Sequence, residues 1–80
     1  MNIPSILHYA FRYALGRMTL APSEVSDAIK ENIKLFTDYE LNLIIKEIYD
    51  ADDEGRIGMN IDRETWYDLV GFIEESRCDN

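Results

Sequence analysis

Cysteine is nearly absent from this chain, which has 80 residues and one cysteine, Cys78. A single thiol can form neither an intramolecular disulfide nor a thiolate metal cluster. Long apolar runs are missing too, since none approaches the 18 residues expected of a transmembrane helix. The N-terminus also lacks the charged start and apolar run of a signal peptide. We therefore expect a cytoplasmic protein.

The chain has few basic residues. It contains eight lysines and arginines and sixteen aspartates and glutamates, which gives a net charge of -8. Residues 1–36 hold four basic and three acidic side chains, whereas residues 37–80 hold four basic and thirteen acidic ones. Such a surface repels phosphate backbones and anionic lipid, and it favours a basic protein groove or a cation. The same acidic balance also serves solubility alone, so both interpretations stay open.

Apolar residues make up 46% of the chain and aromatics 11%, which is enough for an ordered core in a chain of one-domain length. No strand pattern, repeat or low-complexity tract interrupts the helical periodicity. We therefore expect a single helical domain over residues 1–80. The predicted fold is all-α, a compact bundle of three to four short helices with a helical hairpin at the N-terminus.

Apolar spacings of three and four residues place the first two helices. The first begins near Pro4 and is ended by Gly16, after which a tight hairpin turn extends to Thr19. The second has Pro22 in its first turn and an apolar side that continues to Phe36.

Two further helices follow. Thr37 and Glu40 have the spacing of a capping box and open the third helix. Asp62 is the expected cap of the fourth, whose acidic tail is expected to fray from about residue 75. The predicted core of the four helices consists of Leu7, Phe11, Ile29, Ile33, Ile44, Ile48, Trp66 and Val70.

The acidic segment from residue 50 to 61 reads as a loop of about ten residues, and it resembles a calcium loop. Asp50, Asp52 and Glu54 fall at positions one, three and five. Position twelve needs a bidentate glutamate but holds Ile61, and the nearest carboxylate, Asp62, comes one residue late. We therefore expect no specific metal site and no cofactor, with those three carboxylates as weak candidates only.

No catalytic constellation is apparent. His8, the one histidine, has no cysteine or carboxylate at metal-ligand or nucleophile spacing. Neighbouring carboxylates lie in exposed segments where nothing would shift a pKa for acid–base work. A helix-turn-helix interpretation of residues 10–29 conflicts with charge, because the recognition helix would carry Glu24, Asp27 and Glu31. We expect a protein that is not an enzyme and does not bind nucleic acid directly.

Tyrosines offer an alternative interface, since aromatics contribute much of the binding energy at protein interfaces. The candidates are Tyr9 and Tyr13 on the first predicted helix and Tyr67 on the last. Core packing is the commoner role for aromatic residues at this spacing.

Two motifs carry a resemblance: RYALGRMT at residues 12–19, followed by SEV at 23–25, and IGMNIDRETW at residues 57–66. With them the chain resembles a family of small proteins encoded by bacteriophages and prophages, sharing RYALGRxT and GMxxDRxxW motifs. The resemblance implies a phage accessory protein in a bacterial cytoplasm. Small acidic proteins of that kind bind and block host enzymes or defence nucleases such as CRISPR effectors. It implies no functional residues.

The expected function is a non-catalytic inhibitor that places carboxylates in the basic nucleic-acid channel of a host protein, in its sharpest form an anti-CRISPR protein. One alternative is a structural or weakly calcium-binding phage module built around the 50–62 acidic loop. Another is a helical oligomer that sequesters a signalling nucleotide. The predicted partner-binding residues are Glu47, Asp50, Asp52, Asp53, Glu54, Asp68, Glu74 and Glu75.

Overall fold

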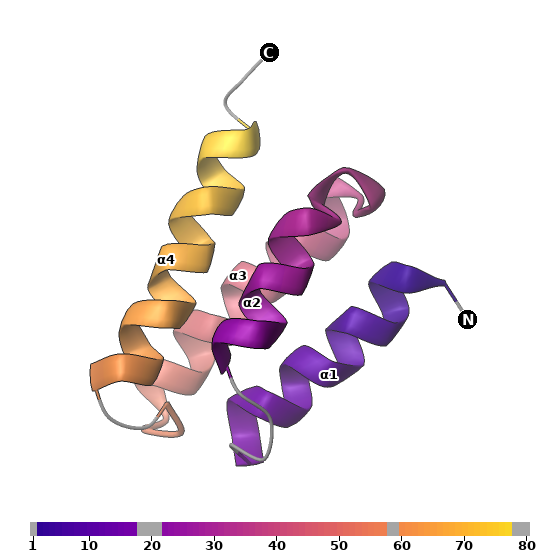
Figure 1. Ribbon diagram of the computed structural model, residues 1–80. Coiled ribbons are helices and arrows are strands. Elements are labelled where there is room, and N and C mark those ends of the chain that lie inside the picture. The colour runs from indigo at the N-terminus through magenta and orange to yellow at the C-terminus, as the bar shows by residue number, and fades with distance from the viewer. Residues whose placement is uncertain (1, 18–21, 58–59, 78–80) are drawn as a thin grey trace.

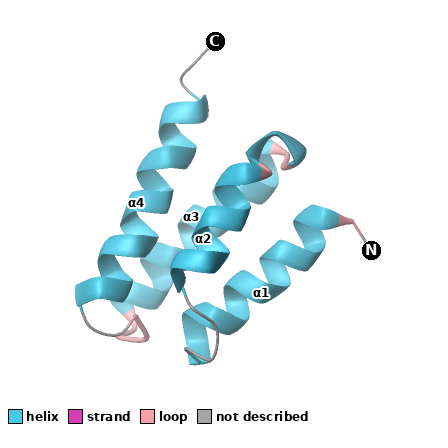
Figure 2. Cartoon of the chain, viewed as in Figure 1, coloured by secondary structure: helices cyan, strands magenta, loops and turns pink. Residues whose placement is uncertain are grey.

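The computed structural model describes residues 2–17, 22–57 and 60–77 (Figure 1). Within these ranges the chain is helical with no strand, which confirms the predicted all-α bundle (Figure 2). None of the described helices is both long and apolar enough to cross a bilayer. The elements are α1 (Ile3–Arg17), α2 (Pro22–Glu31), a 3-10 turn (Ile33–Leu35), α3 (Asp38–Asp53) and α4 (Asn60–Arg77).

The four helices surround one core. α1 and α4 each pack against both α2 and α3. The adjacency of α1 and α2 agrees with the predicted N-terminal helical hairpin, although residues 18 and 19 of its turn lie outside the described residues. α1 itself continues through Gly16 to Arg17, so the prediction that Gly16 ends it was one residue early.

The core is built from the apolar stripes that the spacing predicted. Trp66 of α4 meets Phe11 of α1 edge to face, with ring centroids 5.3 Å apart. Leu7 and Ile33 pack against the core while only partly buried, whereas the other predicted core residues are buried. The buried set is Phe11, Ala14, Leu15, Val25, Ile29, Phe36, Leu41, Ile44, Ile48, Ala51, Ile57, Trp66, Leu69, Val70 and Ile73.

The junction between α2 and α3 differs in part from the prediction. α2 ends at Glu31. The side chain of Asn32 turns back and donates a hydrogen bond of 2.8 Å to the carbonyl of Ala28. This local hydrogen bond favours a turn over a further helical turn. The predicted capping box then opens α3. The backbone N–H of Glu40 donates 3.1 Å to Thr37 Oγ1, and the N–H of Thr37 donates 2.8 Å to Glu40 Oε1.

The predicted acidic loop at 50–61 is wrong in its first third, because α3 continues to Asp53. Ala51 is fully buried and anchors the last turn. Gly55 then takes a φ of 76°, and the Arg56 N–H donates 2.8 Å to the Ala51 carbonyl. The Gly55 N–H donates 3.1 Å to the carbonyl of Asp52, which completes a Schellman motif. Only a short connection separates α3 from α4.

Both ends of α4 also differ from the prediction. The helix begins at Asn60, so Asp62 lies inside its first turn rather than at its N-cap. At the other end the helix continues to Arg77, past the residue at which fraying was predicted. Ile73 is fully buried there, and Arg77 donates a hydrogen bond to Asn42 of α3. These contacts hold the last turns of α4 in place.

Candidate functional site

Glu47 is held inside a hydrogen-bonded cluster instead of being presented to a partner. Its carboxylate accepts from Arg12 Nη2 at 2.7 Å and Nε at 3.1 Å, and His8 Nε2 lies 3.0 Å from Oε1. Only 21% of the Glu47 side chain is exposed. The sequence showed no acidic partner for His8, because the two residues are 39 positions apart. This carboxylate joins α1 to α3.

The charge state of Glu47 follows from the same contacts. Burial by itself raises the pKa of the Glu47 carboxyl. The hydrogen bonds from Arg12 and His8, together with their charges, lower it by a larger amount, so the pKa lies below its ordinary value. The hydrogen bonds to Glu47 also raise the pKa of Arg12. Both partners therefore stay charged.

Asp52 forms a second internal cluster at the junction of α3 and α4. Its carboxylate accepts hydrogen bonds from Arg63 and, at 2.7 Å, from the Tyr67 hydroxyl. The Tyr67 ring lies 5.5 Å from that of Tyr49, and the hydrogen bond to Asp52 raises the pKa of Tyr67. Tyr67 is thus half-buried and hydrogen-bonded to Asp52, whereas Tyr9 and Tyr13 are exposed.

Three further predicted carboxylates are paired with bases of the chain. Asp50 accepts 2.8 Å from Lys46, which raises the pKa of that lysine. Glu54 accepts 2.7 Å from Arg56. On α4, Asp68 accepts 2.6 Å from Lys30 of α2, whose ammonium also lies 5.5 Å from the ring centre of Phe72.

The calcium candidates do not form a loop. Asp50 and Asp52 are both helical, and residues two apart on a helix project to different sides. They bind different bases, and Glu54 binds a third. Within the described residues no group of three or more metal-ligating side chains could hold an ion. The geometry therefore gives no support to the calcium-binding alternative.

Of the eight predicted partner-binding residues, three remain exposed without an ion pair among the described residues: Asp53, Glu74 and Glu75. Asp53 ends α3, and the two glutamates lie near the end of α4. The two glutamates are adjacent, and Asp53 lies at the end of a different helix. The predicted acidic ridge of α3 and α4 is therefore largely neutralised by the chain itself.

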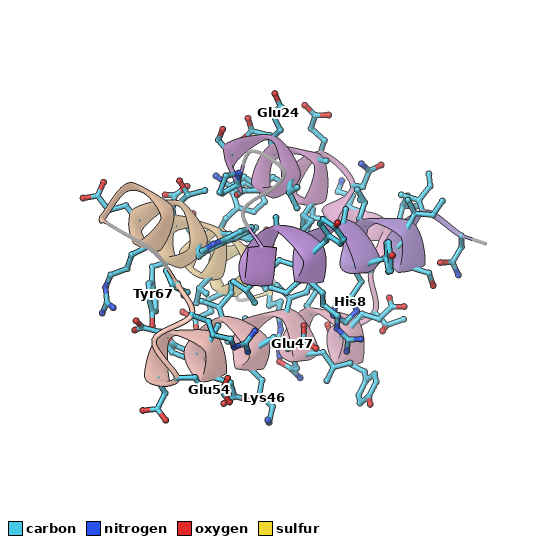
Figure 3. The ribbon with its side chains drawn as sticks, turned by 90° about the horizontal axis from the view of Figure 1, so that it is seen from below. His8, Glu24, Lys46, Glu47, Glu54 and Tyr67 are labelled. Atoms are coloured by element: carbon cyan, nitrogen blue, oxygen red, sulfur yellow. The ribbon has the colours of Figure 1, made fainter. Side chains whose placement is uncertain are left out.

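A different set of carboxylates stays uncompensated on α2. Glu24, Asp27 and Glu31 are exposed, and none forms an ion pair within the described part of the chain. Their spacing of three and four residues puts them on one side of the helix, which we call the α2 acidic face. Figure 3 shows Glu24 at the opposite edge of the molecule from Lys46 and Glu54 of α3. Sequence reasoning gave these residues no binding role.

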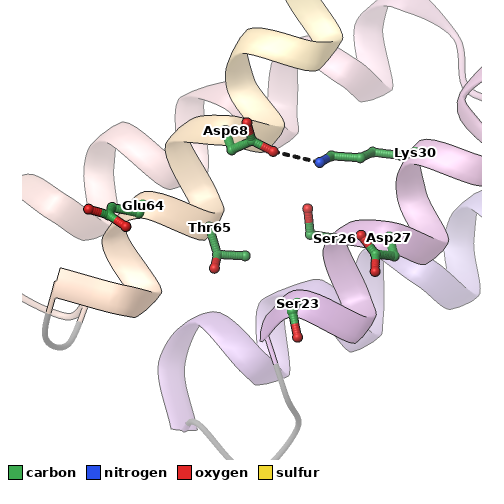
Figure 4. A pocket seen from close by; sticks show the side chains of 7 residues that line it. All are labelled: Ser23, Ser26, Asp27, Lys30, Glu64, Thr65 and Asp68. Carbon is green, nitrogen blue, oxygen red and sulfur yellow. Dashed lines mark hydrogen bonds and ion pairs between the residues drawn. The ribbon is translucent and has the colours of Figure 1, made fainter.

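A groove of about 380 Å³ lies beside the α2 acidic face, between α2 and α4 (Figure 4). At one end the Lys30–Asp68 ion pair bridges the two helices. Ser26 is 2% exposed and points toward α4, whereas Glu64 points away from α2. The lining residues are Ser23, Ser26, Asp27, Lys30, Glu64, Thr65 and Asp68.

The helix-turn-helix interpretation conflicts with the charges of α2. The exposed side of α2 is the α2 acidic face, and its Lys30 is bound to Asp68. Insertion into a major groove would place these carboxylates against phosphates. The surface is suited to a basic partner.

Comparison with known proteins yields no relative: no family model, curated protein or solved structure matches this chain. The first motif covers the end of α1 and the second the start of α4. Trp66, at the end of the second motif, is a core residue, which gives this part of the motif a structural role.

Proposed function

We propose that this chain is a non-catalytic binding protein whose α2 acidic face occupies a basic surface on a partner protein. The observation that carries the proposal is the row of three exposed carboxylates that form no ion pair with a base among the described residues. Complementary charge of this kind steers association and selects among partners more than it adds affinity. The same charge disfavours nucleic acid and anionic lipid as direct partners of this face.

The partner class follows from the resemblance to phage proteins. A phage protein made in a bacterial cytoplasm meets host proteins, and those with nucleic-acid channels present the strongest basic surfaces. The chain would then inhibit its partner by occupying the channel in place of nucleic acid. The sharpest form of the proposal is an anti-CRISPR protein that blocks a guide-loaded effector nuclease.

Charge reversal tests the assignment of the surface. Immobilised chain captures a host protein, and the dissociation constant of the purified pair is then measured at low and high salt. We expect at least tenfold weaker binding at high salt, because exposed charges are screened. The triple variant Glu24→Lys, Asp27→Lys, Glu31→Lys should abolish binding by adding repulsion as well as removing attraction.

The matched control reverses three uncompensated carboxylates outside α2, Asp53→Lys, Glu74→Lys and Glu75→Lys, for the same change in net charge. It should leave binding within about threefold of the unmodified chain, and circular dichroism should show both variants folded. If the control variant loses binding and the α2 variant keeps it, the assigned surface is wrong. If both variants bind normally, charge does not direct recognition, and the exposed tyrosines of α1 replace it as candidates.

A cleavage assay tests the sharper form. Purified guide-loaded effector nuclease is mixed with its DNA target and a molar excess of the chain. Cleavage should stop with the unmodified chain and with the control variant, and it should resume with the α2 triple variant. If the rate of cleavage is unchanged with every effector class tried, the anti-CRISPR form of the proposal is wrong. The more general proposal, that the chain binds a host protein, is then tested by the capture experiment alone.

A further inference from the structure

An apolar stripe runs along the solvent side of α1. Ile3, Ile6 and Tyr9 expose 46%, 49% and 72% of their surface, and Tyr13 exposes 39%. Helical spacing groups these four residues with Ala10 in one band, which borders the buried Ala14 and lies farther from the core residues Phe11 and Leu15. We call this band the α1 stripe. The bundle thus buries one part of the apolar surface of α1 and leaves the α1 stripe largely exposed.

Charge sets α1 apart as well. Residues 3–17 contain no aspartate or glutamate, whereas each of the other three α-helices contains three or more. Two molecules with a net charge of -8 repel, and the cost is greatest where carboxylates face one another. The α1 stripe is the part of the helical surface on which two copies could meet without opposing carboxylates.

The α1 stripe is also complementary to a second copy of itself that runs in the opposite direction. Its first half presents branched aliphatic side chains, Ile3 and Ile6, and its second half presents the paired rings of Tyr9 and Tyr13, whose centroids are 6.4 Å apart. A two-fold axis across the middle of α1 would place the isoleucines of one copy against the tyrosines of the other. Each aromatic ring would then pack on an aliphatic side chain at both ends of the contact.

We propose that this chain forms a homodimer through antiparallel pairing of the α1 stripes. The proposal does not depend on the identity of any host partner. Because the α2 acidic face belongs to α2 and the proposed contact uses residues of α1 only, the dimer contact itself would not use the α2 acidic faces. Two acidic faces in one particle would let it engage two basic sites at once, with the gain in avidity that linked sites provide.

Analytical ultracentrifugation of the full chain tests the dimer. The mass should rise with concentration from 9.3 kDa toward twice that value. Ile6→Glu should raise the dimer dissociation constant at least tenfold by placing a charge in the apolar contact. The matched control is Tyr49→Glu, a residue of α3 with nearly the same exposure, 48%, which should change the constant by less than threefold.

Disulfide trapping tests the orientation. In a Cys78→Ser background, an equal mixture of Ile3→Cys and Tyr13→Cys chains should form the mixed disulfide in excess over either variant oxidised alone. A parallel pairing would reverse that preference and overturn the antiparallel arrangement. Both positions are exposed, so the folded state, checked by circular dichroism, should survive.

Three results would overturn the dimer proposal. The first is a mass that stays at 9.3 kDa at millimolar concentration, and the second is a dimer that the Ile6→Glu substitution leaves intact. The third is a monomer whose α1 stripe binds the host partner or lipid vesicles instead. These results are separable from failure of the proposed function. A dimer that binds no host protein contradicts only the proposed function, and a monomer that binds one through the α2 acidic face contradicts only the dimer.

Discussion

The carboxylates of α3 and those of α2 differ in how many of them are paired. On α3, Glu47, Asp50 and Asp52 each bind a base and the other three bind none, whereas all three carboxylates of α2 are unpaired among the described residues. Along the sequence the order is the reverse, since residues 37–80 hold all of the excess acid. The availability of a charge therefore depends on where the fold brings the bases, and not on the local count of acids.

Two bases from the first half of the chain cause this reversal. Arg12 reaches Glu47 on α3, and Lys30 reaches Asp68 on α4. Each pairs with a carboxylate of the acid-rich half and is therefore not paired with a carboxylate of α2. The α2 acidic face is the consequence.

The largest expected effect concerns the core that both regions share. Ile44→Ala on α3 and Ile29→Ala on α2 should each lower the free energy of unfolding by about 2 to 5 kcal/mol, because both side chains are fully buried. Urea denaturation measures this. Leu35→Ala is the control, since Leu35 is 53% exposed and should change stability by less than about 0.5 kcal/mol. A near-zero effect of Ile44→Ala would place α3 outside the common core.

A smaller effect separates the two kinds of carboxylate directly. Glu47→Ala should cost about 1 kcal/mol, because it leaves His8 and Arg12 without their acceptor at a partly buried site. Glu31→Ala on α2 should change the free energy of unfolding by less than about 0.5 kcal/mol. Equal losses in the two variants would contradict the distinction between structural and available carboxylates.

The pH dependence of stability sharpens the same contrast. The folded-state pKa of Glu47 lies below its ordinary value of 4.5, so its contribution is complete above that pH and is lost as the pH falls through the lowered pKa. Between pH 5 and 3, the unmodified chain should therefore lose more stability than Glu47→Gln does. Urea midpoints measured across that range give the difference. If the stability of both chains falls equally over this pH range, the contacts of Glu47 with its partners do not stabilise the fold.

The smallest expected effect is at Asp50. Its ion pair with Lys46 is exposed, and the carboxylate lies in the last turns of α3, where the helix dipole disfavours negative charge. Asp50→Asn should therefore change the free energy of unfolding by less than about 0.5 kcal/mol, despite the 2.8 Å contact. A loss of more than about 1 kcal/mol in the free energy of unfolding, measured by thermal or urea unfolding, would show that exposed ion pairs also stabilise this fold.

Local signals account for most of the fold that could be predicted. The capping box of Thr37 and Glu40 placed the start of α3 correctly, since it involves residues three apart. Periodicity placed Ile44, Ile48 and Trp66 in the core for the same reason. The end of α3 was missed because acidic residues and a glycine resemble a loop, whereas Gly55 serves there as the left-handed cap of a helix.

The sequence by itself determined the helices and the buried stripes, because hydrophobic periodicity and capping act between residues a turn or two apart. Only the tertiary structure decided which charges remain available. Arg12 and Glu47 are 35 residues apart and Lys30 and Asp68 are 38 apart, so no local pattern relates them. They meet because packing the apolar stripes brings α1 onto α3 and α2 onto α4, and the carboxylates that this packing leaves without a base define the surface proposed to bind a partner.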